Sequence, residues 1–290
     1  KEQRLLGVVS FRDLFRGKAT AAMRDVMKTD VVRVHEEMDQ EAVGATFAEH
    51  DLVALPVVDA AGRMKGVVTV DDIVDVVQEE ATEDIHKIGG SVALDAPYLE
   101  VGLVGMLKKR LGWLLVLFFA QMLTVVAMSY FQVRIDQLSL LSLFVPLILS
   151  SGGNSGSQAS TLVIRAMSLG ELRPSDWKRV FLNELATGLT MGLVLGVIGF
   201  TRVVAIWPGN EEQFANFSWQ LAGAILVSVV GVVLWGTLIG SMLPILLRRF
   251  GLDPASASAP LVATLSDVTG IVVYFSAVSW FLSHVLPPVA

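Results

Sequence analysis

From Leu221 to Leu247 the chain carries no charged side chain. An α-helix needs about 20 apolar residues to cross the hydrocarbon core of a bilayer, so this stretch is long enough to span a membrane. Further apolar segments lie at 112–131, 138–150 and 185–200, and between Pro254 and Leu282. The sequence therefore predicts an α-helical membrane protein with five transmembrane helices, which occupy residues 101–290.

The region before these segments has a different composition. Hydrophobic residues make up 53% of the 290 residues, which is too many for a soluble enzyme of this length. Most of the acidic side chains nevertheless lie in the first 100 residues. The chain has no cysteine, which excludes disulfides and thiolate metal sites and fits a cytosolic soluble part. We expect a cytosolic α+β region ahead of the membrane part.

Basic residues indicate the orientation of the spans, because Lys and Arg are enriched in cytoplasmic loops. If five spans alternate, one side receives Lys108, Lys109, Arg110, Arg173, Lys178, Arg179, Arg248 and Arg249. The loops on the other side contain only Arg134 and Arg202. We expect a multi-pass protein of the cell (inner) membrane with a cytoplasmic soluble region and the C-terminus outside. The first residues do not have the pattern of a signal peptide.

Asp267 is the only charged residue between Pro254 and Leu282. A carboxylate at a bilayer centre costs about 3 kcal/mol, so it usually faces a cavity, a partner or an ion. On a helix it shares a face with small residues such as Ala263 and Gly270. In a two-fold homodimer, two such carboxylates could face each other with a divalent cation between them. The other interpretation is a structural Asp that is protonated or hydrogen-bonded.

A polar segment, SSGGNSGSQ, ends at Gln158 within membrane depth. Such a segment must be buried in protein or line a water-filled path. It is either a pore wall, to which Asn154 and backbone carbonyls offer oxygens, or a packing surface of Ser and Gly. Other glycines recur at helical spacing and predict close helix packing: Gly188, Gly192, Gly196, Gly199, Gly236 and Gly240.

Residues 30–78 alternate strand and helix patterns. Strands are predicted at 31–34, 54–59 and 64–70, with one helix at 39–51 and another that begins near Asp71. The segment LLGVVSFRDLF (5–15) repeats in MKGVVTVDDIV (64–74), which indicates a duplicated domain.

The repeated pattern G-x-x-[ST]-x-x-D, with ALPVVD upstream, resembles the CBS domain pair. Residues 1–78 would then hold the end of one motif and a complete second motif. The resemblance implies a regulatory module that often binds adenine nucleotides, with ATP as the candidate ligand. Asp13 would meet the ribose and Arg12 the phosphates, and Thr69 is the matching hydroxyl position of the second motif.

An acidic run follows, in what we expect to be a connecting helix and linker over 79–100. Within 71–84 there is no Lys or Arg, and the acidic residues are Asp71, Asp72, Asp75, Glu79, Glu80, Glu83 and Asp84. Like charges at helical spacing repel, and hard divalent cations would relieve that repulsion. The other interpretation is a solvated charged face.

Several motifs together resemble the MgtE magnesium channels: EEATEDIHKIGG (79–90), PLILSSGGNSGSQASTLVIRAMSLGEL (146–172), WKRVFLNE (177–184) and GLDPASASAPLVATLSDVTGIVVYF (251–275). The resemblance implies a homodimer whose pore is lined by the second and fifth spans, with Asp267 holding hydrated Mg²⁺ and Asn154 nearby. It also implies closure by cytosolic Mg²⁺ bound at Asp39, Asp51, Asp72, Asp75, Glu80, Glu83, Asp84 and Asp253. The family usually has a further N-terminal domain, so we expect an N-terminally truncated fragment.

The main alternative is a Na⁺- or H⁺-coupled secondary transporter of divalent cations in which Asp267 carries the coupling ion. An enzyme is disfavoured, since the chain has no H-E-x-x-H motif and its histidines are scattered. The expected partners are a second copy of the chain and the lipid bilayer, and no nucleic acid.

Overall fold

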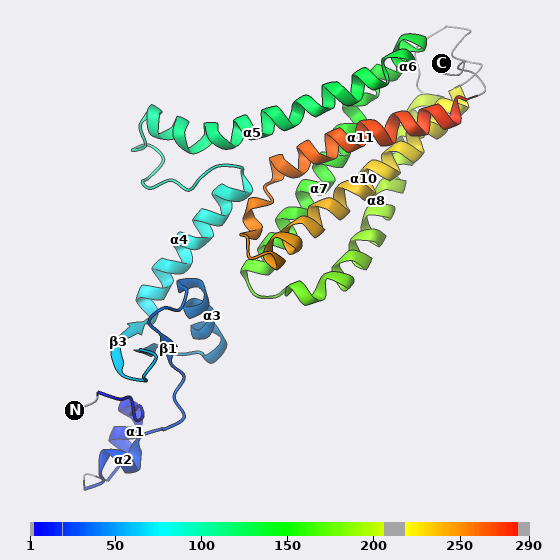
Figure 1. Cartoon of the computed structure of the whole chain (residues 1–290). Helices are drawn as coiled ribbons and strands as arrows, with labels where there is room; N and C mark the ends of the chain where they lie inside the picture. Colours follow the sequence, from blue (N-terminus) through cyan, green and yellow to red (C-terminus); the bar gives the residue numbers. More distant parts are fainter. Residues whose placement is uncertain (1–2, 19, 206–217, 284–290) are drawn as a thin grey trace. The chain divides into compact units, whose positions relative to one another are not determined.

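The structure is a computed structural model that describes residues 3–18, 20–205 and 218–283. The chain divides into two compact units, Lys1–Thr82 and Glu83–Ala290. Helix α4 (Val70–Ile88) begins in the first unit and ends in the second. The two units are described separately below (Figure 1).

The first unit is built on a small mixed sheet. Its strands are β1 (Val34–His35), β2 (Ala54–Val58) and β3 (Met64–Thr69), in the order β1-β2-β3. The pair β1–β2 is parallel and the pair β2–β3 is antiparallel. Helix α3 (Gln40–His50) and the start of α4 bury Phe47 and Ile73 in the core with Leu55 of the sheet.

The strands and helices predicted between residues 39 and 78 are thus present, and the first strand is shorter and later than predicted. The same unit contains the short helices α1 (Phe11–Arg16) and α2 (Met23–Val26).

The sequence repeat has a structural counterpart at two helix starts. The Ser10 hydroxyl donates to the Asp13 carboxylate at 2.7 Å, and Thr69 donates in the same way to Asp72 at 3.0 Å. In each case the hydroxyl precedes the helix and the carboxylate lies in its first turn. Ser10 Oγ also accepts from the Asp13 N–H, and the Asp72 carboxylate accepts from the Thr69 N–H, so each site has one of the two reciprocal backbone bonds of a capping box. The spacing of Ser or Thr three residues before Asp is therefore explained by helix initiation at both copies.

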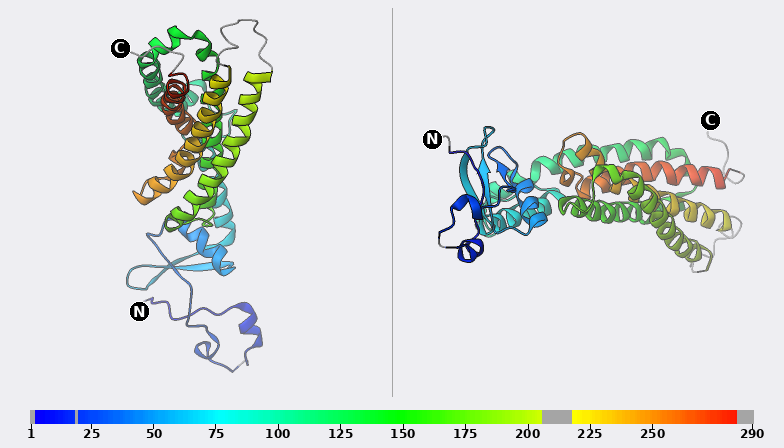
Figure 2. Two further views of the ribbon diagram at one scale, coloured as in Figure 1. Left: turned by 90° about the vertical axis from the view of Figure 1, so that its right-hand side faces the viewer. Right: turned by 90° about the horizontal axis from the view of Figure 1, so that it is seen from below.

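Helices make up the second unit (Figures 1 and 2). They are α5 (Leu103–Tyr130), α6 (Gln132–Gln137), α7 (Val145–Ser168), α8 (Trp177–Ala205), α10 (Ser218–Arg249) and α11 (Ala259–Phe281). Short 3-10 helices precede three of them: η1 (Ser139–Leu143), η2 (Pro174–Asp176) and η3 (Pro254–Ser256). The core lies between α7, α10 and α11, where Ile148, Val232 and Ile271 are fully buried.

Glycines set the distance between the central helices. A Cβ atom at Gly236 would overlap the carbonyl oxygen of Gly152, and one at Gly240 would overlap that of Gly156. On the other side of α10, a Cβ at Gly192 of α8 would lie 2.9 Å from the Cα of Val230. These close approaches confirm that the spaced glycines are packing residues.

Within the described residues, four helices are long and apolar enough to cross a membrane: α5, α8 together with η2 (Pro174–Ala205), α10 and α11. The second predicted span corresponds to α7, which has 24 residues but a polar centre. It begins at Val145, later than predicted, because residues 139–143 form a 3-10 helix and Pro146 is favoured in the first turn of an α-helix. The polar segment is therefore inside a continuous helix, and its backbone carbonyls are used in helical hydrogen bonds.

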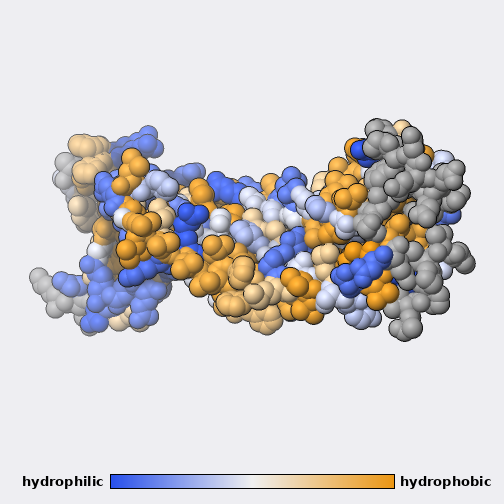
Figure 3. All heavy atoms as spheres, turned by 90° about the horizontal axis from the view of Figure 1, so that it is seen from above, coloured by the Kyte–Doolittle hydropathy of each residue, from blue (hydrophilic) through white to orange (hydrophobic). Residues whose placement is uncertain are grey.

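Apolar side chains cover much of the surface in the space-filling view (Figure 3). On α5 they include Phe119, which is 64% exposed, and Val125, which is 69% exposed. Exposed apolar area of this extent is typical of a surface that faces lipid or another protein chain.

Candidate functional site

Three helices surround the intramembrane carboxylate. Asp267 lies on α11, which begins at Ala259 after the capping residue Ser258. One carboxylate oxygen accepts a hydrogen bond from Gln121 Nε2 of α5 at 3.2 Å. The other oxygen faces α7, because a Cβ atom built on Gly153 would lie 3.9 Å from it. Asp267 is half-buried and lies close to the polar segment of α7.

Helix α7 has two different faces along the polar segment. Its small residues Gly152, Ser155 and Gly156 are buried against the neighbouring helices. The opposite face is exposed and forms a stripe of polar side chains: Ser150, Asn154, Gln158, Thr161 and Arg165. We call these five residues the α7 polar stripe. Asn154 follows Gly153 directly, and its Nδ2 donates to Ser150 Oγ at 3.3 Å.

The packing interpretation is confirmed for one face of the helix. The pore-wall interpretation stays a prediction for the side chains of the opposite face, since the backbone carbonyls are used within the helix. The glycines and Ser155 pack, while the α7 polar stripe stays uncovered in a single chain. Uncovered polar side chains at membrane depth are expected to face water or protein rather than lipid.

A lysine lies between two of the predicted regulatory carboxylates. Lys87 Nζ, near the end of α4, is 2.5 Å from Glu83 Oε1 and 2.6 Å from Asp253 Oδ2. Asp253 also caps η3 by accepting from the backbone N–H of Ala255 at 2.8 Å. Burial alone would lower the pKa of Lys87, but its bonds to Asp253 and Glu83 outweigh burial and raise that pKa. The lysine is therefore charged, and it joins α4 to the segment that leads into α11.

A second contact joins α4 to the membrane helices. Asp84 Oδ2 accepts a hydrogen bond from Ser168 Oγ, the last residue of α7, at 2.6 Å. The end of α4 thus meets both the end of α7 and the start of α11.

The other predicted regulatory residues belong to the first unit and have local roles there. Asp39 caps α3 by accepting from the Glu41 N–H at 2.9 Å, and Asp51 ends the same helix in a left-handed conformation with φ 49°. Asp72 accepts from Thr69, Glu80 accepts from Gln40, and Asp75 is exposed.

Over the described residues of one chain, no three His, Cys, Asp or Glu side chains converge on a possible metal position. The metal assignment of these residues stays a prediction, as does nucleotide binding at Arg12, Asp13 and Thr69.

Two residues of the site were not predicted from the sequence. Gln121 is the only amide within the segment 112–131, and a lone amide in an apolar span is a usable signal. Lys87 gives no such signal, since its contact with Asp253 joins residues 166 positions apart.

Comparison with known proteins gives consistent matches to both units. A family model named MgtE, described as a divalent cation transporter, matches residues 145–277, and a CBS domain model matches residues 23–79. The chain is 42% identical over 282 residues to "Magnesium transporter MgtE" of Thermus thermophilus, which covers 97% of this chain and 60% of that protein. It is 33% identical over 284 residues to the protein of the same name from Enterococcus faecalis, covering 98% and 60%.

Among solved structures, the chain is similar to the cytosolic domain of the Mg²⁺ channel MgtE, which was crystallised in complex with ATP. The identity is 43%, the match covers 26% of this chain and 31% of that chain, and the TM-score is 0.26. The chain spans 60% of the length of each of these two magnesium transporters. Since the family model matches from α7 into α11 and both relatives align with nearly every residue given, the chain belongs to the MgtE family.

Proposed function

We propose that this protein conducts Mg²⁺ into the cytoplasm through a pore that two copies form on a two-fold axis. The observation that carries the proposal is the position of Asp267, one carboxylate oxygen of which is directed to Gly153, the residue that precedes Asn154 of the α7 polar stripe. The names of the relatives as magnesium transporters support the choice of ion.

A symmetric dimer accounts for the uncovered polar groups. In a two-fold interface the same surface of each copy faces itself, so the α7 polar stripes of two copies would meet across the axis. The space between them would be bounded by polar side chains and would exclude lipid. Two Asp267 carboxylates beside that space would repel each other unless a cation lay between them.

Such a site suits Mg²⁺ that keeps its hydration shell. It sheds its water reluctantly, prefers octahedral geometry and usually keeps several waters when proteins bind it. Carboxylates that bind through those waters, together with the Asn154 amide, would hold a hydrated divalent cation. They would bind a monovalent cation less strongly because its charge is smaller.

The contacts of α4 support the predicted orientation. The CBS region is cytosolic, and the end of α4 bonds to Ser168 and Asp253. The end of α7 and the start of α11 are therefore at the cytoplasmic side, and α11 runs outward from there. The C-terminal residues 284–290 lie outside the described part of the chain, and an external C-terminus is part of the proposal.

Cytosolic Mg²⁺ would also close the pore, through the acidic residues of the CBS region and α4. Ions that bind one state more tightly than the other shift the population towards that state. At the junction of α4 and α11, Glu83 and Asp253 already share the cation Lys87. Mg²⁺ that binds these two carboxylates would have to displace the lysine, so Lys87 would set the concentration at which this site fills.

The alternative is a transporter that couples divalent cations to Na⁺ or H⁺. Besides Asp267, the helices α5, α7, α8, α10 and α11 contain one further acidic residue, Glu184, near the start of α8. Coupling through Asp267 would make flux depend on a second ion, whereas a channel responds only to the Mg²⁺ gradient and the membrane potential.

The test is Mg²⁺ flux into proteoliposomes containing wild type or Asp267→Asn. We expect at least about tenfold lower flux for the variant, because a neutral amide removes one charge-assisted contact per copy. Glu184→Gln is the matched control and should retain flux. Full flux in Asp267→Asn would contradict the pore assignment, and a strict requirement for a Na⁺ or H⁺ gradient would favour the coupled transporter.

A further inference from the structure

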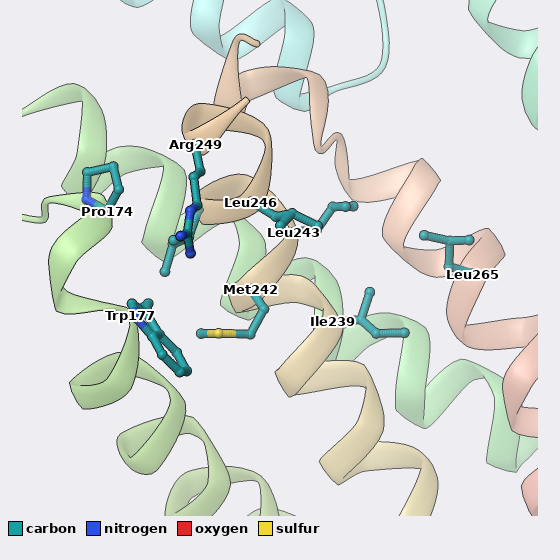
Figure 4. A pocket seen from close by; sticks show the side chains of 9 residues that line it. Pro174, Trp177, Ile239, Met242, Leu243, Leu246, Arg249 and Leu265 are labelled. Atoms are coloured by element: carbon teal, nitrogen blue, oxygen red, sulfur yellow. The ribbon is translucent and has the colours of Figure 1, made fainter. Parts of the chain in front are cut away.

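A cavity of about 430 Å³ lies within the second unit, on the surface formed by α10, the start of α8 and α11 (Figure 4). Its walls include Trp177, Ile239, Met242, Leu246 and Leu265, and the one charged residue in its lining is Arg249. The volume is within the range of about 300–1,000 Å³ that is usual for sites of small organic ligands.

The cavity extends from the level of lipid headgroups into the acyl region. Arg249 is the last residue of α10 and Trp177 the first of α8, both at the cytoplasmic end of their helices. From Arg249 to Ile239 the helix axis covers about 15 Å at 1.5 Å per residue. Arg and Trp are typical of the membrane interface, whereas Ile239 and Met242 lie at the depth of lipid tails.

Arg249 has no ion-pair partner among the described residues, and its side chain turns over the cavity towards Trp177 (Figure 4). A guanidinium group there offers donors in a fixed fork that matches a phosphate. The cavity therefore combines a long apolar wall with one unpaired cation at its cytoplasmic end.

We propose that this cavity binds an anionic phospholipid of the cytoplasmic leaflet, with an acyl chain along α10 and the phosphate on Arg249. A soluble anion would not use the apolar wall, and an uncharged apolar ligand would not use the guanidinium. Basic pockets between transmembrane helices at the cytoplasmic side commonly bind lipid headgroups in this way. The inference rests on the proposed orientation of the helices.

A second copy of the chain is not expected to cover the cavity. Leu265 lines it from α11 and is two residues from Asp267, which places the two side chains about 200° apart around the helix. An axis that passes beside Asp267 therefore leaves the Leu265 side of α11 facing lipid.

The binding test is native mass spectrometry of the full chain, delipidated and incubated with dioleoyl phosphatidylglycerol or dioleoyl phosphatidylcholine. Wild type should prefer phosphatidylglycerol, and Arg249→Gln should reduce that preference about fivefold, the effect of one basic residue near a membrane surface. Arg248→Gln is the matched control, because Arg248 is adjacent and exposed but does not line the cavity. It should keep the preference.

In a second variant, Leu246→Trp, the larger side chain should fill the cavity. The Leu246 side chain is 49% exposed, so the substitution should have little effect on folding. It should lose both lipids while Mg²⁺ flux in proteoliposomes continues. Equal loss of preference in Arg248→Gln and Arg249→Gln would mean general surface attraction and would overturn the proposal. So would unchanged lipid binding in Leu246→Trp. Failure of this variant to dimerise under conditions in which wild type does would also overturn it, because a second copy would then cover the cavity. Because lipid preference is measured without transport, it is separate from failure of the channel proposal.

Discussion

At the level of single residues, Asp267 and Lys87 are both held by partners that are distant in the chain. Asp267 could be predicted as a site residue because one carboxylate in an apolar helix has a known energetic cost. Its hydrogen bond from Gln121 joins residues 146 positions apart, and the Lys87–Asp253 pair joins residues 166 apart. Such pairs depend on tertiary packing, which residue spacing along one helix does not reveal.

If cytosolic Mg²⁺ closes the proposed pore, Lys87→Met should make the Mg²⁺ current more sensitive to that ion. The change leaves Glu83 and Asp253 facing each other without their shared cation, so a divalent ion would bind there without displacing a charged group. A partly exposed ion pair contributes up to about 1 kcal/mol, so half-inhibition should occur at roughly fivefold lower Mg²⁺. The measurement is current in excised patches against Mg²⁺ on the cytoplasmic side.

Lys109→Met is the control for this change, because Lys109 also forms an ion pair, with Asp95 at 2.8 Å, at the start of the first span. It should leave the inhibition curve unchanged, and Lys87→Arg should stay close to wild type since it keeps the positive charge. If Lys87→Met needs as much Mg²⁺ as wild type or more, then the lysine does not compete with the ion.

At the level of elements, helix α7 shows where sequence patterns were sufficient and where they were not. The polar segment at membrane depth was visible in the sequence, as were the glycine rows in the third and fourth spans. The sequence did not show that this segment is helical, because the adjacent residues Gly152 and Gly153 each lower helix propensity by about 1 kcal/mol. Packing of these small residues against α10 and α11 compensates, and the helix continues without interruption.

Gly240→Ala should separate α7 from α10. The added methyl group would overlap the carbonyl of Gly156, which belongs to the backbone and cannot rotate away. Overpacking of this kind costs about 1–3 kcal/mol. We expect a lower unfolding temperature in nanodiscs and weaker Mg²⁺ flux, since α7 carries the polar stripe.

Gly112→Ala provides the comparison, because no atom lies within 4 Å of a Cβ built on Gly112 in α5. This substitution should leave the unfolding temperature equal or slightly higher, as Ala favours the helix. Equal effects of the two substitutions would show that the contact between Gly240 and Gly156 is not limiting for stability.

At the level of the whole molecule, one chain leaves the surface of its membrane unit incomplete. Only Leu117 of the long helix α5 is buried, and the α7 polar stripe is uncovered. The exposed apolar side chains of α5 are compatible with lipid, but the exposed polar side chains of the α7 polar stripe are not. Residue patterns within one chain predict a partner for the carboxylates, and that partner stays a prediction. The packing of α7 supplies the face that the proposed partner would cover.

The absence of cysteine allows a direct test of the two-fold axis. In Asn154→Cys, each copy presents one thiol on the α7 polar stripe, and a residue on the axis faces its own counterpart. A short bifunctional thiol reagent should therefore link two chains in membranes and reduce Mg²⁺ flux by obstructing the pore. Ile198→Cys is the control. The Ile198 side chain on α8 is 61% exposed, and this variant should remain monomeric on denaturing gels after the same treatment. If Asn154→Cys links no better than Ile198→Cys, the α7 polar stripes do not face each other, and the water-filled path must lie within a single chain or along another face.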